Sequence, residues 1–231
     1  MLSYHNDPLV KQKYIARFAT HRAADAVIQG TGFANGRGCF VGCTLNEYNH
    51  YAFPKELGWP IWLAYCADSI FEGLPKSLAP QFGTDLLEAV PVGVDLEPLK
   101  WMLAVARMDR LIEQQELLDY PELDKVLSTL HSAKKYASGM LQHNGDIECK
   151  DLKCFVRSYR HDSSYLQRSG EYAKQSAFCI SESTKGMWPY RSMGSAASSF
   201  FWFRLVRSLD NNIAPYQDEH DALFKALREL K

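Results

Sequence analysis

The sequence has no apolar run that approaches the roughly 20 consecutive residues a helix needs to cross a bilayer. Its first residues, MLSYHNDPLVKQKY, are polar and charged where a secretion signal would need an apolar core. We therefore predict a cytoplasmic protein that spans no membrane. With 46% hydrophobic and 23% charged residues in a chain of 231, the composition is that of a globular protein with a sizeable core.

The strong catalytic signatures are missing as well. The chain contains no Walker A phosphate-binding loop, no G-x-S-x-G nucleophile turn, no H-E-x-x-H zinc motif and no dinucleotide-binding fingerprint. It also lacks sustained alternation of polar and apolar residues, which would mark a half-buried strand. These absences favour an all-α protein that acts by binding over an enzyme with a familiar active site.

Capped segments with helical periodicity fill the chain instead. The first helix is expected over residues 8–29, with Asp7 as its N-cap, Pro8 at its first position and Gly30 as its stop. Apolar residues at a spacing of three to four predict the others. The predicted fold is therefore all-α, a compact multi-helix globular fold of about nine to ten helices, with helix in more than half of the residues. The other helices are expected within 39–48 and over 61–72, 80–89, 96–118, 121–141, 147–160, 164–181, 193–209 and 216–230.

We expect an N-terminal helical region, residues 1–120, and a C-terminal helical region, residues 121–231, packed as one unit. Charge differs along the chain: residues 54–124 carry five Lys and Arg against thirteen Asp and Glu, and residues 125–209 carry thirteen against six. Solvated faces of opposite sign explain this most simply, and an anionic partner of the basic segment is the alternative. Because the basic residues do not gather on one predicted helix, we predict no nucleic-acid binding.

The chain has six cysteines. Without a secretion signal they are better interpreted as reduced thiols than as a disulfide framework. Most are expected to be small core residues. They are Cys39, Cys43, Cys66, Cys149, Cys154 and Cys179.

The strongest candidate site lies within residues 30–75. Several glycines before Cys39 form a loop that leads into the short helix expected over 39–48. A thiol at a helix N-terminus is favoured as thiolate, and Arg37 adds a nearby positive charge. Cys39 is thus a candidate nucleophile with a partly exposed sulfur, whereas Cys43, one turn further on, is expected to lie deeper in the core.

His21 and Asp25 supply the base in this interpretation. They are four residues apart on the first predicted helix, so the imidazole and the carboxylate can touch. A histidine oriented by an acid can activate a thiol, and a partly buried histidine held by a carboxylate is the structural alternative. The candidate catalytic residues are Cys39, His21 and Asp25, and the candidate binding residues are Arg37 and Asn35.

Two other roles remain open for the two nearby thiols. Cys39 and Cys43 are one helical turn apart, and with His50 or His21 they could hold a tetrahedral metal ion. Their C-x3-C spacing differs from the usual C-x2-C knuckle, so we predict no metal and no other cofactor. The simplest outcome is burial of both thiols, with Gly42 letting another backbone come close.

Five short blocks occur in one order: YHNDP, NGRGC-x-VGCTL, ELG-x-P, IFEGLP and VG-x-DLEP. In these blocks the chain resembles an uncharacterised protein family of bacterial and phage genomes. The resemblance runs from Tyr4 to Ile112, about the first half of the chain, and the second half departs from the pattern. The family has no known function, so the resemblance implies a bacterial or phage-related origin and no reaction.

Two functions from different classes stay open. The first is a soluble helical protein-binding or accessory factor of bacterial or phage origin, for example an anti-defence factor, whose partner is another protein. The second is a cysteine-dependent hydrolase or transferase that uses Cys39 with His21 and Asp25. The absence of strong catalytic motifs favours the first.

Overall fold

The computed structural model describes residues 1–142, 165–181, 188–206 and 216–230. These residues contain ten α-helices and the structure is 74% helical, so the predicted all-α class and the predicted number of helices are confirmed. The only sheet within the described residues has two strands of two residues each. None of the described helices is long and apolar enough to cross a membrane. The helix predicted over 147–160 lies outside the described residues.

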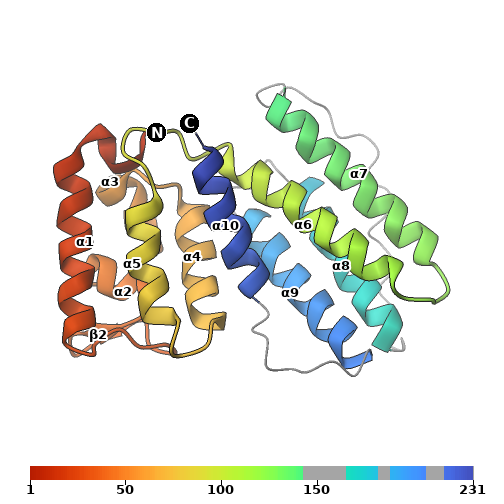
Figure 1. The fold of residues 1–231 in the computed structure, drawn as a ribbon, viewed down its shortest axis with the longest axis horizontal. Coiled ribbons are helices and arrows are strands. Elements are labelled where there is room, and N and C mark those ends of the chain that lie inside the picture. Colours follow the sequence, from red (N-terminus) through yellow and green to blue (C-terminus); the bar gives the residue numbers. More distant parts are fainter. Residues whose placement is uncertain (143–164, 182–187, 207–215, 231) are drawn as a thin grey trace. The chain divides into compact units, whose positions relative to one another are not determined.

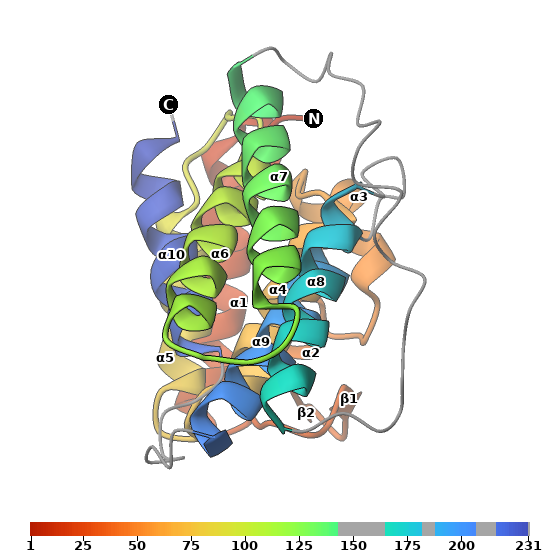
Figure 2. The ribbon, with the colours of Figure 1, turned by 90° about the vertical axis from the view of Figure 1, so that its right-hand side faces the viewer.

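Figure 1 colours the helices from the N-terminus in red to the C-terminus in blue, and Figure 2 also labels β1. Most helices begin and end within a few residues of the predicted segments, whereas the helix at Phe53–Leu57 and the small sheet were not predicted. Two short 3-10 helices at Ser3–Asn6 and His50–Ala52 add to them. The bounds are α1 (Pro8–Ala23), β1 (Phe33–Ala34), β2 (Arg37–Gly38), α2 (Phe40–Leu45), α3 (Phe53–Leu57), α4 (Ile61–Gly73), α5 (Ala79–Ala89), α6 (Leu99–Glu116), α7 (Leu123–Gln142), α8 (Tyr165–Ser181), α9 (Trp188–Val206) and α10 (Gln217–Glu229).

The chain divides into two compact units. Unit 1 comprises residues 1–99 and 216–231, and unit 2 comprises residues 100–215. The division therefore follows Leu99, whereas the sequence placed a boundary at residue 120. The last helix, α10, packs against α4 and α5 and so belongs with the N-terminal unit.

Helix α1 begins as predicted. The Asp7 side chain accepts a hydrogen bond from the Leu9 amide at 2.8 Å, and Pro8 occupies the first helical position. This cap satisfies an amide that the helix itself leaves without a partner. The N-terminal signal in the sequence is thus confirmed.

The predicted end of this helix at residue 29 is wrong. The helix ends at Ala23, and Asp25 takes a left-handed conformation with φ of 51°. The chain then runs alongside Gly38, whose amide donates to the Ala26 carbonyl at 2.9 Å and whose carbonyl accepts from the Ile28 amide at 2.8 Å. Pairing with the glycine-rich loop therefore ends the helix early.

The glycine-rich loop folds back on itself as a small hairpin. Asn35 and Gly36, with φ of 53° and 75°, form the turn between β1 and β2, and Asn-Gly is a strong hairpin signal. At Gly42, in α2, a Cβ atom would lie 2.0 Å from the carbonyl oxygen of Gly32. The expectation that Gly42 lets another backbone come close is therefore confirmed.

Aromatic rings form the centre of unit 1. The Phe40 ring at the start of α2 lies 5.9 to 6.5 Å from four other rings, each measured between centroids. These rings come from α1, α3, α5 and the segment before α4, and Figure 1 shows α1, α5 and α4 side by side. Their packing fixes α2 and hence the position of Cys39, the residue before it. The four are Phe18, Phe53, Phe82 and Trp59.

Unit 2 is built on the helix pair α8 and α9, with α7 beside α8 (Figures 1 and 2). The Ser169 hydroxyl donates to the Ser199 carbonyl at 3.1 Å, and the Ser199 hydroxyl donates back at 2.8 Å. Seven residues along each helix, Ser176 and Ser192 make the same exchange at 2.9 and 3.0 Å. This register makes the two helices antiparallel, and all four serines are fully buried.

The sequence contains a repeated pattern that corresponds to these two serine pairs. The pattern S-x3-A-x2-S occurs at residues 169–176 and again at residues 192–199. The alanines within it, Ala173 and Ala196, are buried as well. Small side chains at these positions let the two helix backbones approach closely.

The pairs Ser169–Ser199 and Ser176–Ser192 form two serine layers between α8 and α9, and helix α6 adds a polar side chain at each layer. The Gln115 amide donates to the Ser169 hydroxyl at 2.9 Å and its oxygen accepts from the Tyr120 hydroxyl at 2.8 Å. The buried Arg107 guanidinium donates to the Ser192 hydroxyl at 3.2 Å. The interior of unit 2 therefore holds a polar network as well as apolar side chains.

Candidate functional site

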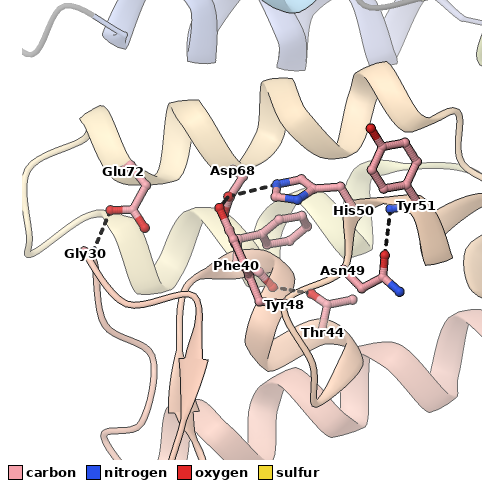
Figure 3. A network of polar contacts seen from close by, with 9 residues as sticks. All are labelled: Gly30, Phe40, Thr44, Tyr48, Asn49, His50, Tyr51, Asp68 and Glu72. Carbon is pink, nitrogen blue, oxygen red and sulfur yellow. Dashed lines mark hydrogen bonds and ion pairs between the residues drawn. The ribbon is translucent and has the colours of Figure 1, made fainter.

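The candidate site lies in unit 1, where α4 faces the glycine-rich loop and the segment after α2 (Figure 3). Asp68 and Glu72 are one turn apart in the C-terminal half of α4. Asp68 is 6% exposed, whereas Glu72 lies at the surface. A buried carboxylate and an exposed one therefore stand on the same side of a single helix.

The loop is fastened to this end of α4 by two consecutive residues. The Gly30 amide donates to Glu72 Oε2 at 2.7 Å. The Gln29 side-chain amide donates to the carbonyls of Phe71 at 2.6 Å and Leu74 at 2.8 Å. Carbonyls at a helix C-terminus have no partner within the helix, so these bonds satisfy groups that the helix leaves free. They also hold the Glu72 carboxylate beside the loop.

His50 and the aromatic residues around it surround the other side of Asp68. His50 Nε2 lies 3.0 Å from Asp68 Oδ2, and the Tyr48 hydroxyl donates to the same oxygen at 3.3 Å. The imidazole stacks on the Tyr65 ring, with centroids 3.9 Å apart, and the Tyr48 ring meets its edge at 5.0 Å. His50 is 6% exposed, so this is a buried pair. The second carboxylate oxygen, Asp68 Oδ1, is buried and has no hydrogen-bond partner.

Cys39 lies at the N-cap of α2, the helix end that the sequence predicted, but its sulfur is not exposed. The residue is fully buried, so the predicted partial exposure is wrong. Burial raises the pKa of the Cys39 thiol well above its ordinary value, and the charge of Asp68 and a hydrogen bond from the thiol to this carboxylate raise it further. The backbone amides of Gly42 and Val41 lower the pKa of this thiol, but by a smaller amount. The Cys39 side chain makes no N-cap hydrogen bond to α2. The helix N-terminus therefore does not produce a thiolate here.

Cys43 is also fully buried, as expected. Its thiol donates to the Gly38 carbonyl at 3.3 Å, and burial raises its pKa to about 11. Among the described residues, the His, Cys, Asp and Glu side chains that come together are instead Cys39, Asp68 and Glu72. Their ligand atoms all lie within 4.8 Å of one another.

Negative charge accumulates at the two carboxylates. Partial burial of the hydroxyl raises the pKa of Tyr48 to about 12, and Asp68 and Glu72 add to the shift. Burial also raises the pKa of Glu72. The hydrogen bond from the Gly30 amide lowers this pKa, and the charge of Asp68 raises it. Among the described residues, no Lys or Arg side chain forms an ion pair with Asp68 or Glu72.

The structure does not bring His21 and Asp25 together with Cys39. His21 Nδ1 lies 3.1 Å from the Gly36 carbonyl and its Nε2 lies 2.6 Å from Asn46 Oδ1. Asp25 lies beyond the end of α1 and is exposed. Within the described residues, no hydrogen bond joins the predicted catalytic residues to one another.

The two predicted binding residues have structural contacts. Asn35 occupies the hairpin turn, and Arg37 donates to the Asp25 carbonyl at 3.3 Å. The sequence interpretation missed Asp68 and Glu72 as members of the site. The available signal was a pair of carboxylates four residues apart on a strongly apolar predicted helix, which places one carboxylate toward the core.

Comparisons with profiles of known protein families, with curated protein sequences and with solved structures find no significant match, so only the geometry of the site guides its interpretation.

Proposed function

We propose that this protein is a binding factor of the bacterial or phage-related kind that the sequence suggests, and that it recognises another protein through the tyrosines of unit 1. The observation that carries the proposal is the exposure of two large aromatic side chains on a rigid support. Tyr48 is 56% exposed and Tyr51 is 69% exposed. We call these two residues the tyrosine face.

Both side chains are held in place before any partner arrives. Tyr48 contacts Asp68 and the His50 ring, as described above. The Tyr51 ring meets the Tyr65 ring at 6.3 Å, and the Asn49 side chain accepts from the Tyr51 amide at 3.1 Å. Exposed tyrosines contribute strongly to protein interfaces, and a preorganised side chain loses little entropy on binding.

The surrounding charge indicates what the partner presents. Glu47 is exposed beside Tyr48, and Glu72 lies close enough to raise the pKa of the Tyr48 hydroxyl. Aromatic rings flanked by carboxylates suit a basic side chain, which the ring faces and the negative charge both attract. We therefore expect a protein segment that places an arginine or lysine against the tyrosine face.

Site-specific photocrosslinking tests the proposal because it captures whichever protein lies against a chosen side chain. Benzoylphenylalanine replaces Tyr51 in one sample and Leu9 in a matched control, because Leu9 is 70% exposed and lies outside the tyrosine face. Both proteins are expressed in the cells that carry the gene, and crosslinked species are identified by mass spectrometry. We expect a specific crosslink to one protein from position 51 and none from position 9.

Affinity measurements with that purified partner complete the test. Tyr51→Ala should weaken binding about tenfold or more, equivalent to about 1.4 kcal/mol, whereas Leu9→Ala should leave it within about twofold. Neither side chain is buried, so both variants should fold. Equal crosslinking from both positions, or full affinity in Tyr51→Ala, would contradict the proposal.

The cysteine-dependent alternative has weaker support. Its nucleophile would need an exposed thiol with a lowered pKa, and burial moves Cys39 in the opposite direction. Alkylation of native, metal-free protein with iodoacetamide distinguishes the two functions. We expect Cys39 and Cys43 to react only on unfolding. A Cys39 that reacts near pH 7 faster than a thiol peptide, and more slowly in His21→Ala, would instead support catalysis.

We also propose a cytoplasmic location. The described cysteines, Cys39, Cys43, Cys66 and Cys179, are buried and in the thiol form. Buried reduced thiols suit a reducing compartment, where disulfides rarely form.

A further inference from the structure

We propose that Cys39, Asp68 and Glu72 form a binding site for one divalent transition-metal ion of the zinc type. The three residues offer one sulfur and two carboxylate oxygens that lie within 4.8 Å of one another. In a tetrahedral zinc site the ligand atoms are roughly 3.3–3.7 Å apart, since zinc lies about 2.3 Å from sulfur and about 2.0–2.2 Å from oxygen. Side-chain movements on the order of an ångström would close the site.

The unpartnered oxygen of Asp68 is an independent sign of a missing ligand. The residue is 6% exposed, and its Oδ1 has no hydrogen-bond partner. A buried carboxylate oxygen without a partner costs free energy, so such atoms are rare in folded proteins. Figure 3 shows this carboxylate on the side of α4 that faces the loop, as Glu72 does. A cation between Cys39 and Glu72 would satisfy it.

The electrostatics of the helix point the same way. Asp68 and Glu72 are like charges one turn apart, and Glu72 lies in the last turn of α4, where the helix dipole is itself negative. Within the described residues, no Lys or Arg side chain pairs with either carboxylate. A divalent ion would remove this repulsion.

The remaining groups suit a metal site. The contact of His50 with Asp68 Oδ2 fixes the orientation of the carboxylate, as hydrogen bonds to metal-binding carboxylates commonly do. Glu72 lies at the surface and Cys39 is buried, so an ion can enter past the exposed carboxylate. A sulfur with two oxygens favours zinc or cobalt over magnesium or calcium, which prefer oxygen alone. On binding, the thiol proton passes to solvent.

This inference goes beyond the proposed function and does not depend on it. Three anionic ligands around one divalent ion leave a net charge of about −1, so the region stays acidic and still suits a basic partner. A metal titration needs no partner, and the crosslinking experiment needs no added metal. The two proposals can therefore fail separately.

The test is a titration of chelator-treated protein with Co²⁺, followed by competition with Zn²⁺. We expect one equivalent of Co²⁺ per chain and a near-ultraviolet charge-transfer band, which only a thiolate ligand produces. Cys39→Ser should abolish the band. Cys43→Ser, which changes an equally buried thiol outside the cluster, should retain it.

A second pair of variants changes exposed carboxylates, and a glutamine at position 72 keeps an oxygen that can accept the hydrogen bond from the Gly30 amide. Glu72→Gln should weaken metal binding at least about tenfold. Glu88→Gln, which changes an exposed carboxylate near the end of α5, should match the wild type. If Cys39→Ser fails to fold, this pair alone decides the matter. The proposal is overturned by the absence of stoichiometric binding, by a band that persists in Cys39→Ser, or by an unchanged affinity in Glu72→Gln.

Discussion

Unit 1 and unit 2 are both helical, but their interiors are packed in different ways. In unit 1 large rings meet around Phe40, and backbone segments come close at glycines, as where the glycine-rich loop touches α2. In unit 2 the helices α8 and α9 meet through serine and alanine, and hydroxyl groups bond to carbonyls across the interface. The two units therefore obtain close packing from side chains of different size.

This difference explains why the candidate site is in unit 1. Ring packing around α2 and the fit between loop and α2 bring Cys39 to α4, a helix distant in sequence. In unit 2 the buried polar groups mostly satisfy one another, as the reciprocal serine pairs show. A buried polar atom without a partner occurs in each unit, at Gln114 Oε1 in unit 2 and at Asp68 Oδ1 in unit 1. The atom of Asp68 belongs to a carboxylate beside Cys39 and Glu72, and this combination with other ligand atoms is what suits a binding role.

The largest expected effect comes from replacing a helical glycine by alanine, once in unit 1 and once in unit 2. Gly42→Ala should destabilise unit 1 by about 1–3 kcal/mol or more, because its Cβ would lie 2.0 Å from the Gly32 carbonyl oxygen and the loop would have to move. Gly194→Ala in α9 should stabilise unit 2 by about 0.5–1 kcal/mol, because nothing lies within 4 Å of the added atom and alanine favours helix.

Hydrogen exchange read by mass spectrometry assigns each effect to its unit. We expect amides of unit 1 to lose protection in Gly42→Ala and amides of unit 2 to gain it in Gly194→Ala. Equal small effects at both positions would mean that the loop does not lie tightly against α2.

The sequence predicted the helices of both units because local signals determine them. The Asp7 and Pro8 signals at α1 and the Pro60 signal at α4 mark helix starts that the structure confirms. The end of α1 was wrong because pairing between residues 26–28 and Gly38 overrides the local helical pattern. Such a pairing joins segments that no local pattern links.

The candidate site was only partly foreseen. The sequence predicts Cys39 as a site residue and a helix N-terminus at that position. It also offers His50 as a candidate metal ligand. It did not connect Asp68 or Glu72 with that thiol, because their proximity depends on how α4 packs against the loop. The depth of Cys39 was wrong for the same reason: a helix N-terminus can be predicted locally, whereas its burial depends on neighbouring elements.

A smaller effect is expected in unit 2 from enlarging one serine. Ser192→Val should destabilise the unit by about 1–3 kcal/mol, because it places a larger side chain in a fully buried contact of α8 and α9 and removes the hydroxyl that bonds to Ser176. Ser195→Val, three residues along the same helix and only half-buried, is the matched control and should change stability by about 0.5 kcal/mol or less.

Urea unfolding monitored in unit 2 by hydrogen exchange measures both variants. A larger loss in Ser195→Val than in Ser192→Val would show that the serine layers are not the tightest part of this interface.

The smallest expected effect is a difference between the two units in how their stability depends on pH. In unit 1 the Glu56 carboxylate accepts a hydrogen bond from the Tyr14 hydroxyl, and this bond and the nearby Lys13 hold the pKa of Glu56 below its ordinary value. A carboxyl with a lowered folded pKa stabilises the fold above its unfolded pKa, about 4.3, and this stabilisation is lost as the pH falls through the folded pKa. Because about a third of the Glu56 side chain is exposed, the contribution should stay below about 1 kcal/mol.

Glu56→Gln should therefore lower the stability of unit 1 slightly at pH 7, and the difference from the wild type should shrink below about pH 4. Glu47→Gln, an exposed carboxylate of the same unit, is the control and should show no such convergence. The serines between α8 and α9 and the Gln115 side chain of α6 carry no titrating proton in this range, so protection in unit 2 should not respond to the substitution. Thermal unfolding and hydrogen exchange across this pH range test the expectation, and a Glu56→Gln difference that grows toward low pH would contradict the assigned sign.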